Sequence, residues 1–196
     1  EDKNQGFFFF FMGGYGTNDR YESSLLMNYF KGEQKISLLA SSNNINSTGF
    51  SMDEIFDNMG GGRSRMTSYS SNGGFSINGR NFGGGNGITT SNMVGLNFSD
   101  QFAEGLDFSS SYFYNNSNSE NTNKTKQTNL LPTGNFVSNS ESNTISENNG
   151  HSIKADVEYD ISDKLSVGIT PNFTTGNSIT RNNYLSNSED ENGRAL

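Results

Sequence analysis

The side chains that could carry chemistry are few. The chain has a single histidine, His151, and no cysteine. Without cysteine it can form no disulfide framework, no cysteine-based zinc site and no thiol nucleophile. No serine or carboxylate can be assigned to His151 as a catalytic partner, so we expect a surface or interface histidine there. We therefore expect no enzyme, no metal site and no cofactor.

Glycine-rich and acidic segments also resemble known ligand sites superficially. The segments 60–63 and 83–87 contain runs of glycine. Neither is followed by Gly-Lys-Ser/Thr or by the start of a helix, so we interpret both as flexible loops rather than phosphate-binding loops. The acidic segment 189–193 lacks the ligand spacing of an EF-hand, which favours a solvated loop over a calcium site.

A first group of candidate site residues lies in one alternating segment. Lys154, Asp156, Glu158 and Asp160 alternate with apolar residues from Ile153 to Ile161. Because successive side chains of a strand point to opposite faces, this segment has one charged and one apolar face. The charged face can tune ion passage through a pore or form salt bridges with a domain inside it, and both interpretations remain open.

A second group of candidates lies in a long connection. Ser51 and Glu54 match a capping box, which predicts a short helix over 52–58. Its acidic residues Asp53, Glu54 and Asp57, with Arg63 beyond it, are candidates for contacts of an outer loop with a substrate or partner. The alternative is a helix that only folds over the mouth of the domain.

Period-two alternation recurs along most of the chain. It is clearest over 150–161 and 165–173, which are joined by a tight turn at 162–164 and predict a β-hairpin. Further strands are expected over 6–16, 20–30, 34–44, 88–99 and 105–116, with an eighth near 178–185. The run from Phe7 to Phe11 breaks the alternation, and the sequence offers no physical account of it.

Strand length and loop length point in the same direction. Strands of about 10–12 residues exceed the usual 5–6 and match the roughly 9–11 residues of a tilted transmembrane strand. The links 31–33, 100–104 and 162–164 are short, whereas 45–87 and 117–149 are long. Since antiparallel strands alternate in direction, all short links lie at one end, as in outer-membrane barrels with short periplasmic turns and long extracellular loops.

The composition fits this interpretation. Only 30% of residues are hydrophobic, yet 12% are aromatic, and the net charge is −8. The negative charge argues against a nucleic-acid binder, and no apolar run is long enough for a transmembrane helix. A closed barrel satisfies every backbone hydrogen bond in lipid. Outer-membrane lipid would then contact the apolar face of each strand, and water or a plug the polar face.

Several segments resemble a recurring pattern in TonB-dependent outer-membrane receptors that carry a carboxypeptidase-regulatory-like domain. The segments are Gly14-Tyr15-Gly16-Thr17-Asn18-Asp19-Arg20-Tyr21-Glu22, Asn28-Tyr29-Phe30-Lys31-Gly32, Ile36-Ser37-Leu38-Leu39, Ser42-Asn43-Asn44-Ile45-Asn46 with Gly49-Phe50-Ser51, and Gly87-Ile88-Thr89-Thr90. They cover the first half of the chain, while the second half matches in the rhythm of strands and turns.

The resemblance implies a barrel of around 22 strands, closed by an N-terminal plug domain, that imports a nutrient across the outer membrane of Gram-negative bacteria. Its partners would be its own plug, TonB through the plug, and a surface lipoprotein. The chain shows seven or eight strands, no recognisable plug or TonB box, and no terminal aromatic strand. We therefore expect residues 1–196 to be an internal part of one barrel domain.

Two other functional classes remain. A structural or secretion-associated outer-membrane barrel, without a TonB-coupled transport cycle, has the same strand pattern. A secreted all-β adhesin is the third class, and for it shorter strands and unsorted loops are expected.

Overall fold

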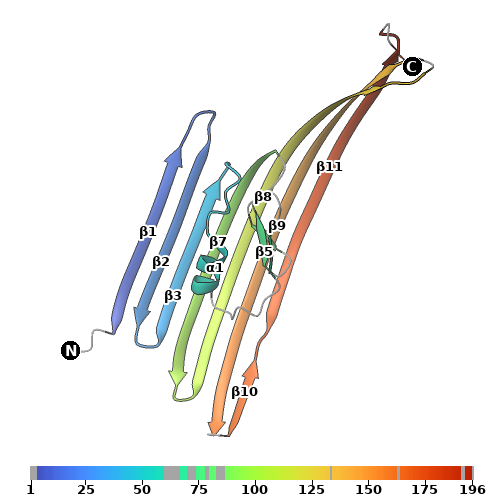
Figure 1. Ribbon diagram of the computed structural model, residues 1–196. Helices are drawn as coiled ribbons and strands as arrows, with labels where there is room; N and C mark the ends of the chain where they lie inside the picture. The colour runs from blue at the N-terminus through green and yellow to red at the C-terminus, as the bar shows by residue number, and fades with distance from the viewer. Residues whose placement is uncertain are drawn as a thin grey trace.

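The chain is dominated by one antiparallel β-sheet of long strands (Figure 1). The structure is a computed structural model that describes residues 4–59, 67–69, 74–77, 80–82, 87–132, 134–162, 164–190 and 193–195. The all-β antiparallel architecture predicted from the alternation is confirmed. Within the described residues the sheet is open and does not close into a barrel.

Eight strands form this sheet, in the order β1-β2-β3-β7-β8-β9-β10, with β11 also paired to β9. Their bounds are β1 (Gln5–Tyr15), β2 (Tyr21–Lys31), β3 (Gln34–Asn43), β7 (Ile88–Ala103), β8 (Leu106–Asn129), β9 (Phe136–Ser162), β10 (Leu165–Ile169) and β11 (Asn172–Asp190). Between β3 and β7 the described residues form one helix, α1 (Met52–Met59), and a small second sheet of β4 (Thr67–Tyr69), β5 (Phe75–Ile77) and β6 (Arg80–Phe82).

The last edge of the sheet is shared by β10 and β11. Both pair with β9, β10 along its end and β11 from Lys154 back to Phe136. They are separated at Pro171, which has no N–H to donate but whose carbonyl accepts the Ala155 N–H at 3.0 Å. The strand expected near 178–185 is confirmed as part of β11, which continues the edge that begins with β10.

The expected sorting of the links by length is found only in part, because at the end of the sheet where long links were expected only the β3–β7 connection is long. The turns β2–β3, β7–β8 and β9–β10 are tight and lie at one end of the sheet (Figure 1). However, most of 117–149 is strand, because β8 and β9 pair without interruption from Leu106↔Tyr159 to Asn129↔Phe136. Ser, Asn and Thr side chains hide the alternation there, while the backbone ladder needs no apolar residue.

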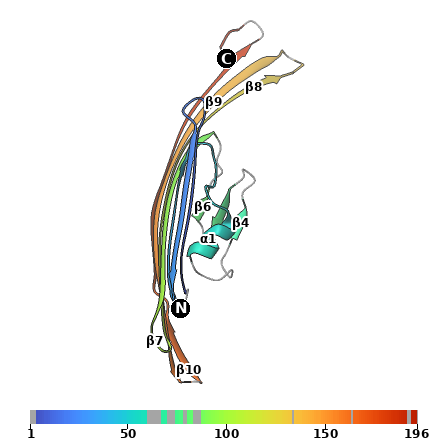
Figure 2. The ribbon, with the colours of Figure 1, turned by 90° about the vertical axis from the view of Figure 1, so that its left-hand side faces the viewer.

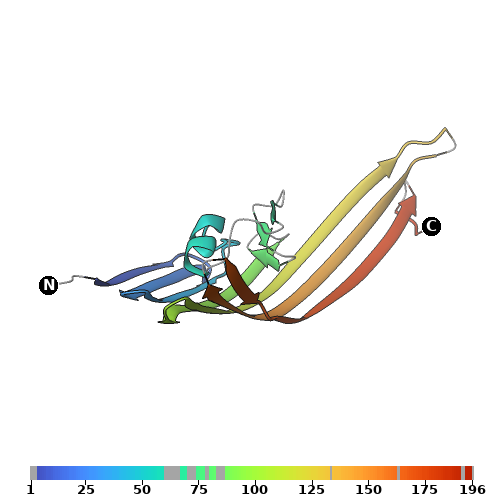
Figure 3. The same cartoon turned by 90° about the horizontal axis from the view of Figure 1, so that it is seen from below.

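The sheet is curved, and α1 and the small sheet lie on its concave side (Figures 2 and 3). β8, β9 and β11 extend beyond the other strands and bend toward that same side. None of the helices in the described part of the chain is long and apolar enough to cross a membrane.

A small apolar cluster attaches α1 to the sheet. Its buried members are Leu26, Leu39, Phe50, Ile55, Phe75, Met93 and Phe113, with Met52 and Phe56 packed against it. Strands β2, β3, β7 and β8 each contribute one side chain, and the remainder come from the β3–β7 connection. This cluster explains why a long connection folds back over the sheet, since burial of apolar area is the main favourable term in packing.

The start of α1 is the predicted capping box. The Glu54 N–H donates to Ser51 Oγ at 3.2 Å, and the Ser51 N–H donates to Glu54 Oε2 at 2.7 Å. These bonds satisfy two backbone donors at the helix end that have no partner within the helix. The helix expected over 52–58 is confirmed.

Leu39→Ala tests the apolar cluster. Leu39 is 1% exposed, and removal of a buried leucine side chain costs about 2–5 kcal/mol of unfolding free energy. We expect a loss of that size in urea unfolding followed by circular dichroism. Leu130→Ala is the control, since Leu130 is 76% exposed. Equal losses for both variants would contradict the assignment of Leu39 to the core.

Candidate functional site

The sheet has two faces of different chemistry. We call the face that carries α1 the inner face and the opposite one the outer face. The register places Leu26 beside Leu39, and Gly95 of β7 between Leu39 and Phe113. Because side chains alternate, every second residue from these positions shares the inner face.

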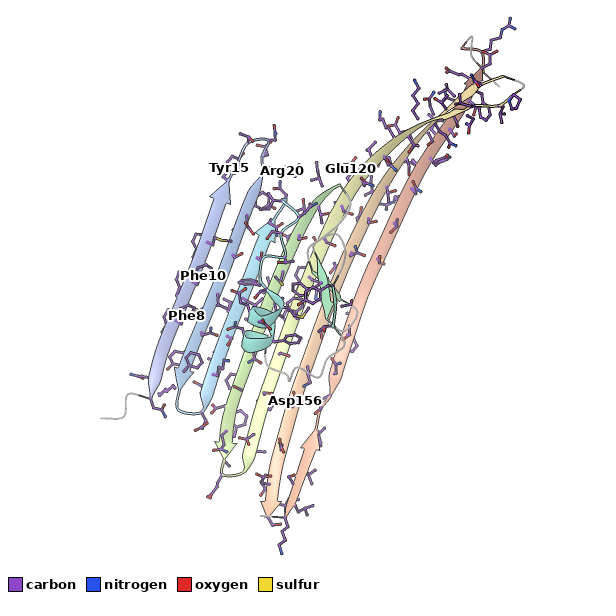
Figure 4. The ribbon with its side chains drawn as sticks, in the orientation of Figure 1. Phe8, Phe10, Tyr15, Arg20, Glu120 and Asp156 are labelled. Atoms are coloured by element: carbon purple, nitrogen blue, oxygen red, sulfur yellow. The ribbon has the colours of Figure 1, made fainter. Side chains whose placement is uncertain are left out.

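The four charged candidates of β9 lie on the inner face. Phe113, a member of the apolar cluster, pairs with Ser152, so residues 154, 156, 158 and 160 share its face. Figure 4 shows Asp156 on this part of β9. The residues alternating with them, such as Val157, lie on the outer face. The alternation predicted this division correctly.

Electrostatic contacts on this part of the inner face are local. The Lys154 ammonium forms an ion pair with the Asp156 carboxylate. Asp107 lies directly opposite Glu158 in the ladder and accepts a hydrogen bond from Gln101 Nε2 at 3.1 Å. Among the described residues no three carboxylate or histidine side chains are close enough together to hold a metal ion. This part of the inner face is therefore a charged surface.

The candidates of the long connection are placed differently from one another. Glu54 caps α1, so its carboxylate is engaged with Ser51. Asp53 lies in the first turn of the same helix, and Asp57 lies within it. Arg63 falls outside the described residues. The helix that carries the acidic candidates packs on the inner face of the sheet rather than projecting from it.

A network of polar side chains around the buried Asn43, none of them among the predicted candidates, holds the start of this connection. Asn43 is 1% exposed. Its Oδ1 accepts the Ser47 N–H at 3.1 Å, and its Nδ2 donates to the Ser47 carbonyl at 3.0 Å. Ser47 Oγ in turn donates to Glu22 Oε1 at 2.6 Å. The Asn-rich sequence after a strand was the available signal, because asparagine side chains form such local turns.

Further bonds fix both ends of the connection. Asn46, which has a positive φ of 61°, accepts the Thr89 N–H at 2.8 Å and donates to the Gly87 carbonyl at 2.8 Å. Deeper in, Asn28 Nδ2 donates to Asn58 Oδ1 at 2.9 Å, linking β2 to α1. Residue 49 has to be glycine, since φ is +77° and a Cβ would lie 2.0 Å from Ser41 Oγ.

The outer face carries an apolar band bounded by polar side chains. At one boundary a chain of hydrogen bonds crosses four strands: Tyr21 Oη to Ser42 Oγ at 3.3 Å, Ser42 Oγ to Asn92 Oδ1 at 2.7 Å, and Asn92 Nδ2 to Asn116 Oδ1 at 3.3 Å. At the other boundary Gln34 Nε2 donates to Asp100 Oδ2 at 3.0 Å.

The band between these boundaries is continuous and has a constant height on the two strands that carry both boundaries. Ser42 and Gln34 are eight residues apart on β3, as are Asn92 and Asp100 on β7, which corresponds to about 26 Å along each strand. The side chains between them on this face are all apolar. They are Ile36, Leu38 and Ala40 on β3 and Val94, Leu96 and Phe98 on β7.

Aromatic side chains gather at both boundaries of the band. At the Asn116 end Tyr112 Oη lies 2.9 Å from His151 Nδ1, and the rings of Tyr114 and His151 are 4.9 Å apart. At the other end Phe98 and Phe102 both pack on Phe108, with ring centroids 6.1 and 5.4 Å away. His151 is thus part of an aromatic group on the outer face.

The phenylalanine run lies on the edge strand β1 (Figure 4). Phe7, Phe9 and Phe11 are on the outer face, whereas Phe8 and Phe10 are on the inner face beside Asn28 and Leu26. All five are at least 44% exposed. The run breaks the alternation because this strand presents apolar side chains on both faces.

Asn43→Ala tests the polar network. Loss of the bonds to Ser47 leaves partly buried backbone groups without partners, which costs about 1–3 kcal/mol. We expect earlier proteolytic cleavage in the β3–β7 connection and a matching loss of unfolding free energy. Asn118→Ala is the control, because Asn118 is exposed on β8. Unchanged proteolysis of Asn43→Ala would contradict the role of the network.

Comparison with known proteins gives no match, since no family model, no curated protein and no solved structure matches the chain. The structure by itself establishes an all-β fold with an open antiparallel sheet of long strands.

Proposed function

We propose that this chain forms part of the wall of a transmembrane β-barrel in the Gram-negative outer membrane, in a TonB-dependent transporter that imports a nutrient. Its outer face contacts lipid and its inner face lines the lumen. The observation that carries the proposal is the apolar band between two polar boundaries on the outer face. The assignment as a transporter rests, in addition, on the sequence resemblance to TonB-dependent receptors described above.

The height of the band supports contact with lipid. A transmembrane barrel presents an apolar band about 25 Å tall with aromatic residues at both interfaces. Here the boundaries are separated by eight residues along β3 and β7, and aromatic groups lie near both of them. The exposure of Leu96 (44%), Ile153 (49%) and Val167 (46%) is unfavourable in water but suits lipid.

The curvature of the sheet supports the assignment of the two faces. In a barrel the convex face meets lipid and the concave face encloses the lumen. The concave face here carries Ser, Asn and charged side chains together with α1 (Figure 2). A connection that folds inward onto this face would narrow the pore and contact a plug. The function proposed is passage of a substrate, without covalent chemistry.

The two edges of the sheet indicate how further strands would join it. Each neighbouring pair is antiparallel, so β1 and the β10–β11 edge run in the same direction (Figure 1). Direct pairing of these edges would be parallel, whereas outer-membrane barrels are antiparallel. Each edge therefore needs a strand of the opposite direction from the rest of a larger barrel.

Membrane extraction tests the barrel. We expect the protein to remain with the outer membrane in high salt and in alkaline carbonate and to be released by detergent. Complete release into buffer without detergent would overturn the proposal in favour of a secreted adhesin. TonB depletion then distinguishes a transporter from a structural or secretion-associated barrel. Nutrient uptake by a transporter stops without TonB, whereas the function of a structural or secretion-associated barrel is unaffected.

A matched pair of lysine substitutions tests which face meets lipid. Val157→Lys places a charge on the outer face, and we expect impaired assembly, since a charge facing lipid costs about 2–4 kcal/mol at the midplane. Glu158→Lys changes the neighbouring residue on the inner face and should be tolerated. The measurement is the fraction of folded protein in outer-membrane preparations, and equal effects at both positions would show that the faces are wrongly assigned.

A further inference from the structure

A shallow depression of about 240 Å³ lies on the outer face, beside the polar boundary that contains Ser42 and Asn92. It extends over β1, β2, β3 and β7, near the end of the sheet opposite the tight turns (Figure 1). Its floor is the small side chain of Ala40, which has Leu25 and Val94 as its partners in the ladder on either side. The other apolar side chains of β3 on this face are Ile and Leu, so the alanine leaves a gap in the apolar band.

The ring of Phe11 forms the wall of this depression on the side of β1. A Cβ at Gly13 would lie 3.3 Å from Phe11 Cζ, so the ring leans along the strand toward the polar boundary and covers the glycine. Phe11 pairs with Leu25 and is 63% exposed. A flat ring on one side and a branched side chain, Val94, on the other enclose an apolar depression that is open away from the sheet.

The polar rim of the depression has its hydroxyl hydrogens in use. Ser42 Oγ donates to Asn92 Oδ1 at 2.7 Å, so the Tyr21 hydroxyl, 3.3 Å away, is the donor to Ser42 Oγ. Ser23 Oγ donates to the Ser42 carbonyl at 3.4 Å. Because a hydroxyl that donates one bond keeps acceptor lone pairs, these oxygens can accept bonds from a ligand.

The rim also has one donor. Asn92 Nδ2 carries two hydrogens, and one of them is bonded to Asn116 Oδ1 at 3.3 Å. The second hydrogen can bond to a ligand next to the acceptor oxygen of Ser42. The rim therefore offers an acceptor and a donor side by side, and among the described residues none that lines the depression is charged.

This pair of groups is complementary to an amide, which donates through its N–H and accepts through its carbonyl. An ester has the carbonyl alone and would leave the Ser42 oxygen without a donor. At the edge of the hydrocarbon region a polar group without a partner is costly. The chemistry of the rim therefore favours an amide next to an acyl chain over an ester in the same place.

We propose that the depression binds the amide-linked acyl chain of an outer-leaflet lipid, with the chain over Ala40 and the amide bonded to Ser42 and Asn92. The inference rests on the proposed barrel, because only then does the outer face meet lipid and the end opposite the short turns face the outer leaflet. Lipid tails are as apolar as the side chains around Ala40, so packing and hydrogen bonds supply the selectivity.

The first test compares two lipids that share a headgroup and chain length but differ in linkage. The full-length protein, purified in detergent and stripped of co-purified lipid, is titrated with ceramide phosphoethanolamine, which is amide-linked, or with diacyl phosphatidylethanolamine, which is ester-linked. Bound lipid is counted by native mass spectrometry. We expect the amide-linked lipid to bind about tenfold more tightly, equivalent to about 1.4 kcal/mol. Equal affinities would overturn the inference.

Matched substitutions on the outer face then locate the site. Ala40→Leu fills the depression and should weaken binding of the amide-linked lipid about tenfold, whereas Ala155→Leu makes the same change on β9 and should not. Ser42→Ala should abolish the preference for the amide-linked lipid, while Ser110→Ala, beside Ala155 on the same face, should leave the preference unchanged. Equal effects within both pairs would contradict the site.

Three further outcomes complete the test. Lipid A, which also carries amide-linked chains, is titrated as a competitor, and displacement of the ceramide lipid supports the amide as the recognised group. A dimer that excludes lipid and is lost in Ala40→Leu would overturn the inference in favour of a second copy of the chain. Protein that stays with membranes in alkaline carbonate but shows no preference for the amide refutes this inference alone, whereas protein that washes off refutes the barrel and the inference with it.

Discussion

The structure depends on one constraint, the alternation of side chains along strands whose backbones are fully paired. Because the period is two, each residue is committed to one face once the register is set. Between the two polar boundaries, the apolar band occupies the outer face from β2 to β10. A shift by one residue would bring Glu158 and Asp160 to that face and the apolar band to the side of α1.

The inner face shows how this constraint combines with local packing. Most of its side chains are polar, and α1 is held by a few apolar residues around Leu39 and by asparagine bonds such as Asn28 to Asn58. The apolar contacts supply affinity for the sheet, and the polar network determines the path of the chain from Asn43 to α1. Together they place a long connection on the concave side of the sheet.

Residues 117–129 of β8, 136–149 of β9 and 177–190 of β11 form a three-stranded arm beyond the apolar band. Side chains alternate between two faces there as well, although neither face is apolar. Its rows are held by backbone pairing and by hydroxyl and amide contacts, yet the charges still segregate, with Lys124 and Glu141 on the outer face and Asn182 on the inner face. Register in a sheet that is polar on both sides is weakly specified by itself. The arm is in register because the same strands β8 and β9 continue from the apolar band.

The sequence alone determined the strand pairs joined by tight turns, the two faces of β9, and the capping box at Ser51 and Glu54, because each depends on residues near one another in the chain. It could not predict the strands over 117–149, since alternation of serine with asparagine carries no hydrophobic signal, or the continuation of β10 into β11. Only the tertiary structure decided that α1 lies on the concave side, that Asn43 and Asn46 fix its connection, and that a polar boundary crosses four strands from Tyr21 to Asn116. These features join residues distant in sequence, and their positions follow from register, curvature and packing, which no local pattern contains.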